Sequence, residues 1–159
     1  MRNGMDLLLS VPPAAARGSE VRDPGDGPWF ATSDPPGRQL GSGGGTAHLL
    51  QAAWAASGSK SFAAWLQESR KLIVHGSGQS RRLPAYAAEG KLRLPLPVMS
   101  TVTGQRPDQT LLDLQFADYG RLFRHAPASY RVMVTCGDVL VRSPHWVPRY
   151  PEADVLTQF

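Results

Sequence analysis

Short apolar runs alternate along this chain with longer stretches in which apolar residues recur at helical spacing. The apolar runs have the length of β-strands, and they occupy residues 29–32, 71–75 and 131–136, with a weaker candidate at 95–99. The periodic stretches predict helices over about residues 46–57, 61–70 and 108–124. Strands and helices that alternate in this way predict an α/β fold with a mostly parallel sheet. We expect residues 1–28 to form a loop-rich amino-terminal segment.

The helical stretches collect their large side chains on one face. Gln115 shares such a face with the apolar residues of the stretch 108–124. Core or helix packing, and not contact with a cofactor, is the expected role of four aromatic residues: Trp54, Trp65, Phe116 and Tyr119.

The strand at 71–75 leads into a glycine-rich loop and then into positive charge. The loop Gly76-Ser77-Gly78-Gln79-Ser80 precedes Arg81 and Arg82, and Lys91 follows. Between positions 70 and 93 six residues are basic and only Glu89 is acidic. Backbone N–H groups and cations arranged in this order are typical of polyphosphate sites, although a solvated loop can share the composition. Neither a P-loop nor a dinucleotide fingerprint is present.

A second glycine run lies upstream, at Gly41-Ser42-Gly43-Gly44-Gly45-Thr46. A flexible linker is the simplest interpretation of such a run. This run, however, passes directly into the helix predicted from residue 46, which Thr46 can cap through its hydroxyl group. Because glycines before a helix leave free N–H groups at its positive end, we interpret the run as a ligand loop.

The strand at 131–136 ends in Gly137-Asp138. We expect this strand to be buried and to deliver the Asp138 carboxylate to the carboxyl edge of the sheet, where ligands of open α/β proteins bind. A carboxylate there can hold Mg²⁺ that bridges phosphate oxygens, whereas a turn-forming Asp is the alternative. His75, at the end of its own strand, is expected to be partly buried and bonded to backbone more often than to contact phosphate.

Composition narrows the class of protein. Cys136 is the one cysteine, which excludes an internal disulfide and fits a reducing cytoplasm. No apolar stretch approaches the roughly 20 residues of a membrane span, and the first residues do not form a signal peptide. The basic pI of about 9.6 is not accompanied by a nucleic-acid-binding motif. We therefore expect neither a nucleic acid nor a membrane as partner.

With these motifs laid out, the chain resembles the amino-terminal part of the fucose-1-phosphate guanylyltransferase domain found in bifunctional L-fucokinase/GDP-fucose pyrophosphorylases. The resemblance covers nearly the whole chain, and its motifs lie at residues 8–13, 29–37, 40–46, 75, 78–86, 90–91, 104–105, 108–115, 137–139 and 151–155. Ser77 departs from the family pattern, which usually has a glycine there. The resemblance stops at Val155, so we expect a fragment of a longer gene or a degenerate remnant.

The resemblance implies a Rossmann-like, GT-A-like nucleotidyltransferase fold that is truncated at its carboxyl end. Residues 29–159 would form the amino-terminal portion of the domain, without its remainder and without the kinase domain. The implied reaction joins GTP and L-fucose 1-phosphate into GDP-L-fucose and pyrophosphate, with Mg²⁺ as cofactor. Lys91 and Arg81 are the expected catalytic residues, and Asp138 is the expected metal ligand. Nucleotide contacts are expected from Gly43, Gly44, Gly45, Thr46, Gly78, Gln79 and Arg82.

Two alternatives stay open. The chain could be a non-catalytic nucleotide-binding remnant, because the sugar-binding half and a second metal carboxylate are missing. It could also belong to an L-fucokinase, although the kinase domain is missing as well. For the guanylyltransferase itself, we expect activity in the full-length context and an inactive fragment when this chain is alone.

Overall fold

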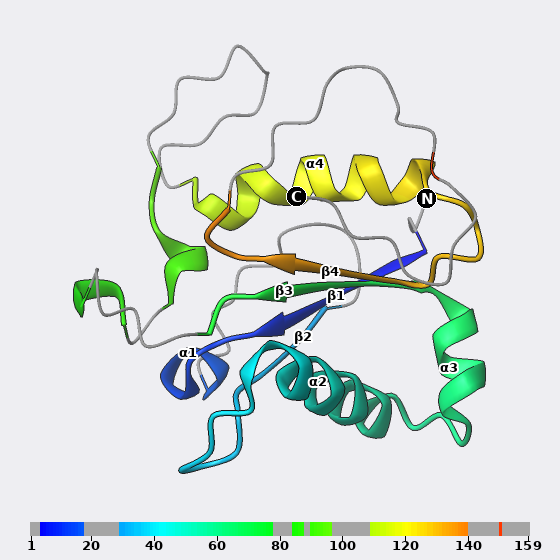
Figure 1. Cartoon of the computed structure of the whole chain (residues 1–159), viewed down its shortest axis with the longest axis horizontal. Helices are drawn as coiled ribbons and strands as arrows, with labels where there is room; N and C mark the ends of the chain where they lie inside the picture. The colour runs from blue at the N-terminus through cyan, green and yellow to red at the C-terminus, as the bar shows by residue number, and fades with distance from the viewer. Residues whose placement is uncertain are drawn as a thin grey trace.

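The structure, a computed structural model, describes residues 4–17, 29–77, 84–87, 90–96, 109–139 and 150. Its strands form one parallel sheet in the order β2-β1-β3-β4, with α4 on one face and α2 on the other (Figure 1). The elements are β1 (Met5–Ser10), α1 (Pro13–Arg17), β2 (Trp29–Thr32), α2 (Gly41–Ser57), α3 (Phe62–Glu68), β3 (Arg70–His75), η1 (Pro84–Tyr86), η2 (Lys91–Arg93), α4 (Leu111–His125) and β4 (Val132–Cys136). The predicted α/β fold with a parallel sheet is confirmed.

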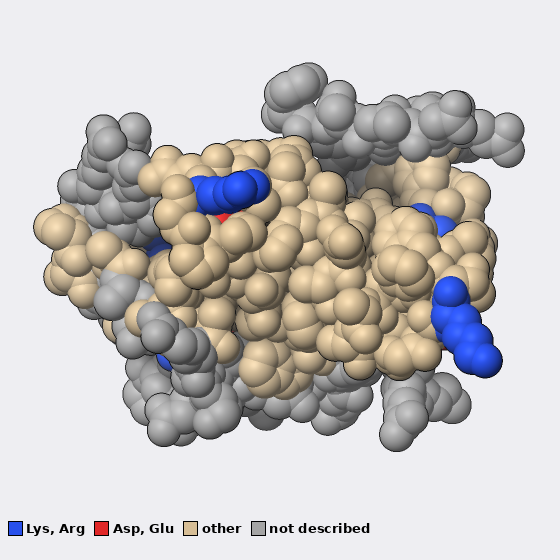
Figure 2. Space-filling view, turned by 90° about the horizontal axis from the view of Figure 1, so that it is seen from below, with Lys and Arg blue, Asp and Glu red and all other residues tan. Residues whose placement is uncertain are grey.

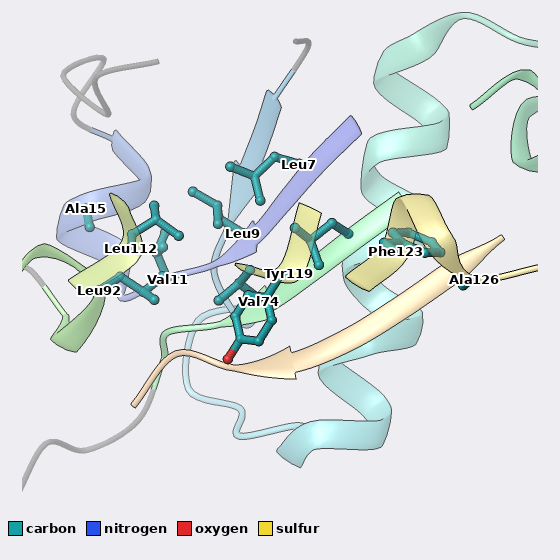
Figure 3. Packing of buried hydrophobic residues seen from close by; sticks show 11 residues of the cluster. Leu7, Leu9, Val11, Ala15, Val74, Leu92, Leu112, Tyr119, Phe123 and Ala126 are labelled. Atoms are coloured by element: carbon teal, nitrogen blue, oxygen red, sulfur yellow. The ribbon is translucent and has the colours of Figure 1, made fainter. Parts of the chain in front are cut away.

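The two central strands are apolar on both faces, as parallel strands between helices must be. Leu7 and Leu9 of β1 face α4, where they pack with Tyr119 and Phe123 (Figure 3). Leu8, between them, packs on the other face of the sheet. The second core cluster, beneath α2 and α3, contains Leu8, Leu49, Ala53, Trp65 and Ile73. Trp54 and Phe116 pack against these clusters, so the expected packing role of the four aromatic residues is confirmed.

The expectation of a loop at the start of the chain is wrong for residues 5–10. These residues form β1, which pairs with β2 on one side and β3 on the other. Leucine is not a strong strand former, and three leucines in a row have no periodicity that separates strand from helix. Tertiary pairing on both sides decides the outcome here.

Two helix boundaries also differ from the prediction. Helix α2 begins at Gly41 instead of residue 46, so the glycine run forms its first turns and Thr46 is not its cap. The Thr46 hydroxyl instead donates to the Ser42 carbonyl one turn earlier (2.8 Å). Helix α4 begins at Leu111, because Thr110 and Asp113 form a reciprocal capping box there.

The expectation of a buried strand at 131–136 is also wrong. Within the described residues β4 pairs with β3 alone, and Val134 is 52% exposed. The weaker strand candidate at 95–99 is reduced to a single bridge between Pro95 and Thr110, while residues 97–99 lie outside the described part.

The α2 side of the sheet carries little charge. Helix α2 has no acidic or basic residue other than His48, and Figure 2 shows the face over α2 and α3 as almost free of charged side chains among the described residues. None of the described helices is long and apolar enough to cross a membrane.

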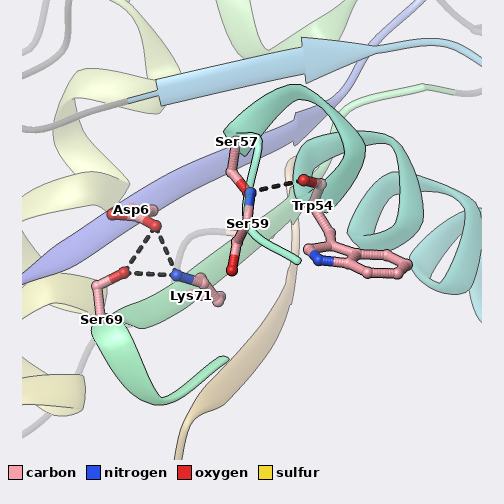
Figure 4. Close-up of polar contacts among 6 residues, drawn as sticks. All are labelled: Asp6, Trp54, Ser57, Ser59, Ser69 and Lys71. Atoms are coloured by element: carbon pink, nitrogen blue, oxygen red, sulfur yellow. Dashed lines mark hydrogen bonds and ion pairs between the residues drawn. The ribbon is translucent and has the colours of Figure 1, made fainter. Parts of the chain in front are cut away.

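The amino ends of the central strands are joined by a buried ion pair. Lys71 is completely buried, and its Nζ lies 2.7 Å from Oδ2 of Asp6 and 2.5 Å from Oγ of Ser69 (Figure 4). The same ammonium group lies over the Trp65 ring, 4.3 Å from its centroid. At the same edge the Arg70 guanidinium donates to carbonyl groups at the end of α4. Two of the six basic residues counted for a phosphate site therefore serve the fold instead.

Candidate nucleotide site at the carboxyl edge of the sheet

Because all four strands are parallel, their carboxyl ends meet at one edge, on the left in Figure 1. The ladder continues one residue past the strands. The Gly76 N–H donates to the Ser10 carbonyl (2.7 Å), and the Gly137 N–H donates to the His75 carbonyl (2.8 Å). The exits of β1, β3 and β4 are thereby held side by side, in the region where ligands of open α/β sheets bind.

Leu92 fixes the short helix η2 on this edge. Its side chain is 3% exposed and lies against the backbone of both strand exits. A Cβ atom added to Gly76 would lie 2.2 Å from Leu92 Cδ1, and one added to Gly137 would lie 2.4 Å from Leu92 Cδ2. Only glycine at these two positions leaves room for Leu92. The consequence is that Lys91, the preceding residue, is placed at the exit of β4.

Lys91 and Asp138 form an ion pair there. Nζ of Lys91 lies 2.6 Å from Oδ2 of Asp138, and the two side chains are 34% and 50% exposed. An exposed pair of this kind contributes only about 0–1 kcal/mol, so a ligand can separate its two groups at small cost. The structure thus brings together the predicted catalytic lysine and the predicted metal carboxylate.

Two buried residues of α4 hold the turn that carries Asp138. Nε2 of Gln115 donates to the Val139 carbonyl (2.5 Å), and the Tyr119 hydroxyl lies 3.1 Å from the same oxygen. Burial raises the pKa of Tyr119, so the phenol keeps the proton that it donates. Sequence reasoning placed Gln115 on the apolar helix face without a role. A polar residue at that position is the signal that could have identified it.

The predicted residues Gly43, Gly44, Gly45 and Thr46 lie in the first turns of α2, beside the end of β3. The N-cap residue is Leu40, whose side chain cannot accept the N–H groups of the first turn, and no acidic residue lies in that turn. The Asp34 carboxylate accepts the Leu40 N–H just before this turn (3.1 Å), and the first-turn N–H groups that follow can bind an anion. The Cα of Gly45 faces the His75 ring and the Asp34 carboxylate, at 3.5 and 3.7 Å from the position of an added Cβ.

The imidazole ring of His75 forms a hydrogen bond with a side chain, whereas we expected a backbone partner from the sequence. Its Nε2 lies 2.8 Å from Oγ1 of Thr46. Because that hydroxyl gives its own proton to Ser42, its oxygen accepts from His75, which requires a proton on Nε2. Burial lowers the pKa of His75, and the nearby Asp34 carboxylate offsets part of this effect. The ring is therefore neutral near pH 7.

Four predicted site residues, Gly78, Gln79, Arg81 and Arg82, lie outside the described residues. The expected catalytic role of Arg81 and the expected nucleotide contacts of the other three stay predictions. Just before them, the Ser77 hydroxyl lies 2.7 Å from the buried Ser10 hydroxyl. The serine that departs from the family pattern thus ties the start of this loop to the end of β1.

Known proteins support the resemblance drawn from the motifs. The chain is 40% identical over 154 residues to an L-fucokinase/L-fucose-1-P guanylyltransferase of Bacteroides fragilis, a match that covers 96% of this chain and 16% of that protein. It is 33% identical over 107 residues to a fucose-1-phosphate guanylyltransferase of Mus musculus, covering 66% of this chain and 16% of the relative. No protein-family model and no solved structure matches the chain. These two matches support the interpretation of this chain as a fragment of a fucose-1-phosphate guanylyltransferase domain.

Proposed function

We propose that this chain supplies the nucleotide-binding part of a sugar-1-phosphate guanylyltransferase, which converts GTP and L-fucose 1-phosphate into GDP-L-fucose and pyrophosphate. The observation that supports this proposal most directly is the Lys91–Asp138 ion pair at the carboxyl edge of the sheet. This pair lies in a chain that is 40% identical to a protein named for that transfer.

This reaction mainly requires that the charge on the phosphates is neutralised and that the two reactants are aligned. An oxygen of the sugar phosphate attacks the α-phosphorus of GTP, the bond from the α-phosphorus to the bridging oxygen breaks, and pyrophosphate leaves with the electron pair. No general base is needed because the attacking phosphate is already ionised. The Lys91 ammonium group would neutralise charge at the α-phosphate, while the first-turn N–H groups of α2 would bind nucleotide oxygens.

The Asp138 carboxylate fits a magnesium ion only together with a nucleotide. Within the described residues no group of three or more His, Cys, Asp or Glu side chains could hold a metal. Mg²⁺ commonly takes one or two carboxylates and completes its shell with substrate phosphates and water, which matches a single half-exposed carboxylate. Bound there, the ion would supply further neutralisation of the phosphate oxygens. Metal and nucleotide should therefore bind together.

A nucleotide-binding protein without catalysis is the second candidate. The chain spans 16% of the length of the curated relatives that it matches, so the sugar phosphate would need binding groups from elsewhere. Transfer requires both reactants to be held in line. The kinase activity in the name of the Bacteroides relative is a third candidate, and none of the described residues favours it.

A coupled assay of pyrophosphate release separates these candidates. We expect the protein in its full length to release pyrophosphate only when GTP, Mg²⁺ and fucose 1-phosphate are all present. The 159-residue chain alone should bind GTP weakly and release none. GTP binding by the full-length protein without turnover would favour the second candidate. ADP formation from ATP and fucose, without pyrophosphate, would favour the kinase.

A further inference from the structure

The amino-terminal turn of α2 needs support from the rest of the fold. Four of its first five residues are glycines, which are among the poorest helix formers. Leu40 offers no side-chain cap, so the usual local support of a helix start is missing. A turn of this composition keeps its shape only if tertiary contacts hold it.

Such contacts exist at both ends of the turn. Before it, Oδ2 of Asp34 accepts the Leu40 N–H (3.1 Å). After it, Nε2 of His75 donates to Oγ1 of Thr46 (2.8 Å). The Thr46 hydroxyl in turn donates to the Ser42 carbonyl, so the hydrogen bonds from His75 continue into the turn itself.

His75 also touches the other half of the candidate site. Its backbone carbonyl accepts a hydrogen bond from the N–H of Gly137 (2.8 Å), and Gly137 is the residue before Asp138. Its ring lies beside the Cα of Gly45. One residue at the end of a central strand therefore contacts the glycine turn through its side chain and the Asp138 turn through its backbone.

We infer that His75 is a positioning residue, which through Thr46 sets the separation between the glycine turn of α2 and the Lys91–Asp138 pair. The inference rests on the proposed function, because the two halves of the site would bind one nucleotide. His75 touches no substrate in this role. Its effect is to keep the donors of the turn and the charges at the exit of β4 in one fixed geometry, as in-line transfer requires.

The test compares variants of the full-length protein. His75→Ala and Thr46→Val each remove the hydrogen bond, and we expect kcat/KM for GTP to fall about 10–100-fold in both, since small misplacements of bound groups have effects of this size. His75→Gln keeps an N–H donor and Thr46→Ser keeps the hydroxyl group, so both variants should retain most of the parental activity. The double variant should lose no more than either single variant, because both remove the same interaction.

Two controls separate positioning from mere folding. His125→Ala changes an exposed histidine of α4 and should leave the kinetics unchanged. Amide hydrogen exchange should be faster at residues 42–45 in His75→Ala than in the parent, with no change at β1. A purely structural role would lower the melting temperature without changing kcat/KM of the folded protein, and conservative variants would not rescue it.

The outcomes distinguish the two proposals. A parent that neither binds GTP nor releases pyrophosphate overturns the proposed function and, with it, this role of His75. An active parent whose His75→Ala and Thr46→Val variants keep parental kcat/KM overturns the inference alone. Loss that is fully additive in the double variant also overturns it, because the two side chains would then act separately.

Discussion

The ammonium group of Lys91 lies 2.6 Å from Oδ2 of Asp138, across 47 positions of sequence. Each group is the counterion of the other in this structure, and both are accessible to solvent. If a nucleotide and Mg²⁺ bind at this edge, Asp138 exchanges the ammonium group for the metal, and Lys91 becomes free to meet a phosphate. The pair then holds both groups in place before the ligand arrives.

Lys91→Ala should remove activity with little effect on the fold. A cation at the reacting phosphate contributes roughly 3–4 kcal/mol, by analogy with an oxyanion donor, so kcat should fall about 10²–10³-fold. The melting temperature should change little, since the exposed ion pair contributes about 0–1 kcal/mol. Lys60→Ala, in the exposed segment before α3, is the matched control. Activity of Lys91→Ala within a few-fold of the parent would remove Lys91 from the site.

Asp138→Asn should uncouple nucleotide binding from magnesium. In the parent, removal of Mg²⁺ with EDTA should weaken GTP binding, because the metal would be bound by the Asp138 carboxylate and the GTP phosphates together. In Asp138→Asn, GTP binding should be weak at every Mg²⁺ concentration. Calorimetric titrations across a magnesium series measure this, with Asp118→Asn on α4 as control. A parental magnesium dependence in Asp138→Asn would place the metal elsewhere.

Gly43→Ala should stabilise the protein and weaken the nucleotide complex. An added Cβ meets no atom within 4 Å, and alanine is better than glycine in a helix by about 1 kcal/mol. A nucleotide that approaches the backbone there would collide with the new methyl group. Thermal melting and GTP titration of the same sample read the two effects. The control Gln51→Ala, further along α2, should leave GTP affinity unchanged. If Gly43→Ala also keeps the parental GTP affinity, the nucleotide does not contact this turn.

The contact between Leu92 and Gly76 should behave as a steric pair. Gly76→Ala places a Cβ 2.2 Å from Leu92 Cδ1, and overpacking of this kind costs about 1–3 kcal/mol. Because the other close neighbour, the Ser10 carbonyl, lies at an ordinary 3.4 Å, adding Leu92→Ala should relieve the collision. Urea unfolding of both variants checks this. If the double variant is less stable than Leu92→Ala by the full cost of Gly76→Ala, Leu92 does not fill that space.

Much of the arrangement at the edge follows from the sequence. Apolar runs identify β2, β3 and β4, and parallel pairing brings the carboxyl ends of such strands together. That reasoning is sufficient to expect Lys91 and Asp138 at one edge. Arg70 and Lys71 are the first two residues of β3, so they lie at the opposite end of the sheet, which a simple count of basic residues does not reveal.

Other features depend on contacts that no local pattern encodes. The start of α2 was missed because glycine propensity favours a loop, whereas contacts from Asp34 and His75 hold the turn as a helix. The exposed character of β4 was missed because its sequence, VMVTC, matches that of a central strand. Which strands neighbour it is decided by tertiary structure.

The location of the bound nucleotide on this chain can be measured directly. Two-dimensional NMR spectra of the ¹⁵N-labelled protein are recorded during titration with GTP and Mg²⁺. We predict amide shift changes at Gly43, Gly45, Gly137 and Asp138, which lie at the carboxyl edge, and none at Lys71 at the opposite end of the sheet. Shift changes confined to the amino edge, or none at saturating GTP, would contradict the claim that this edge binds a nucleotide.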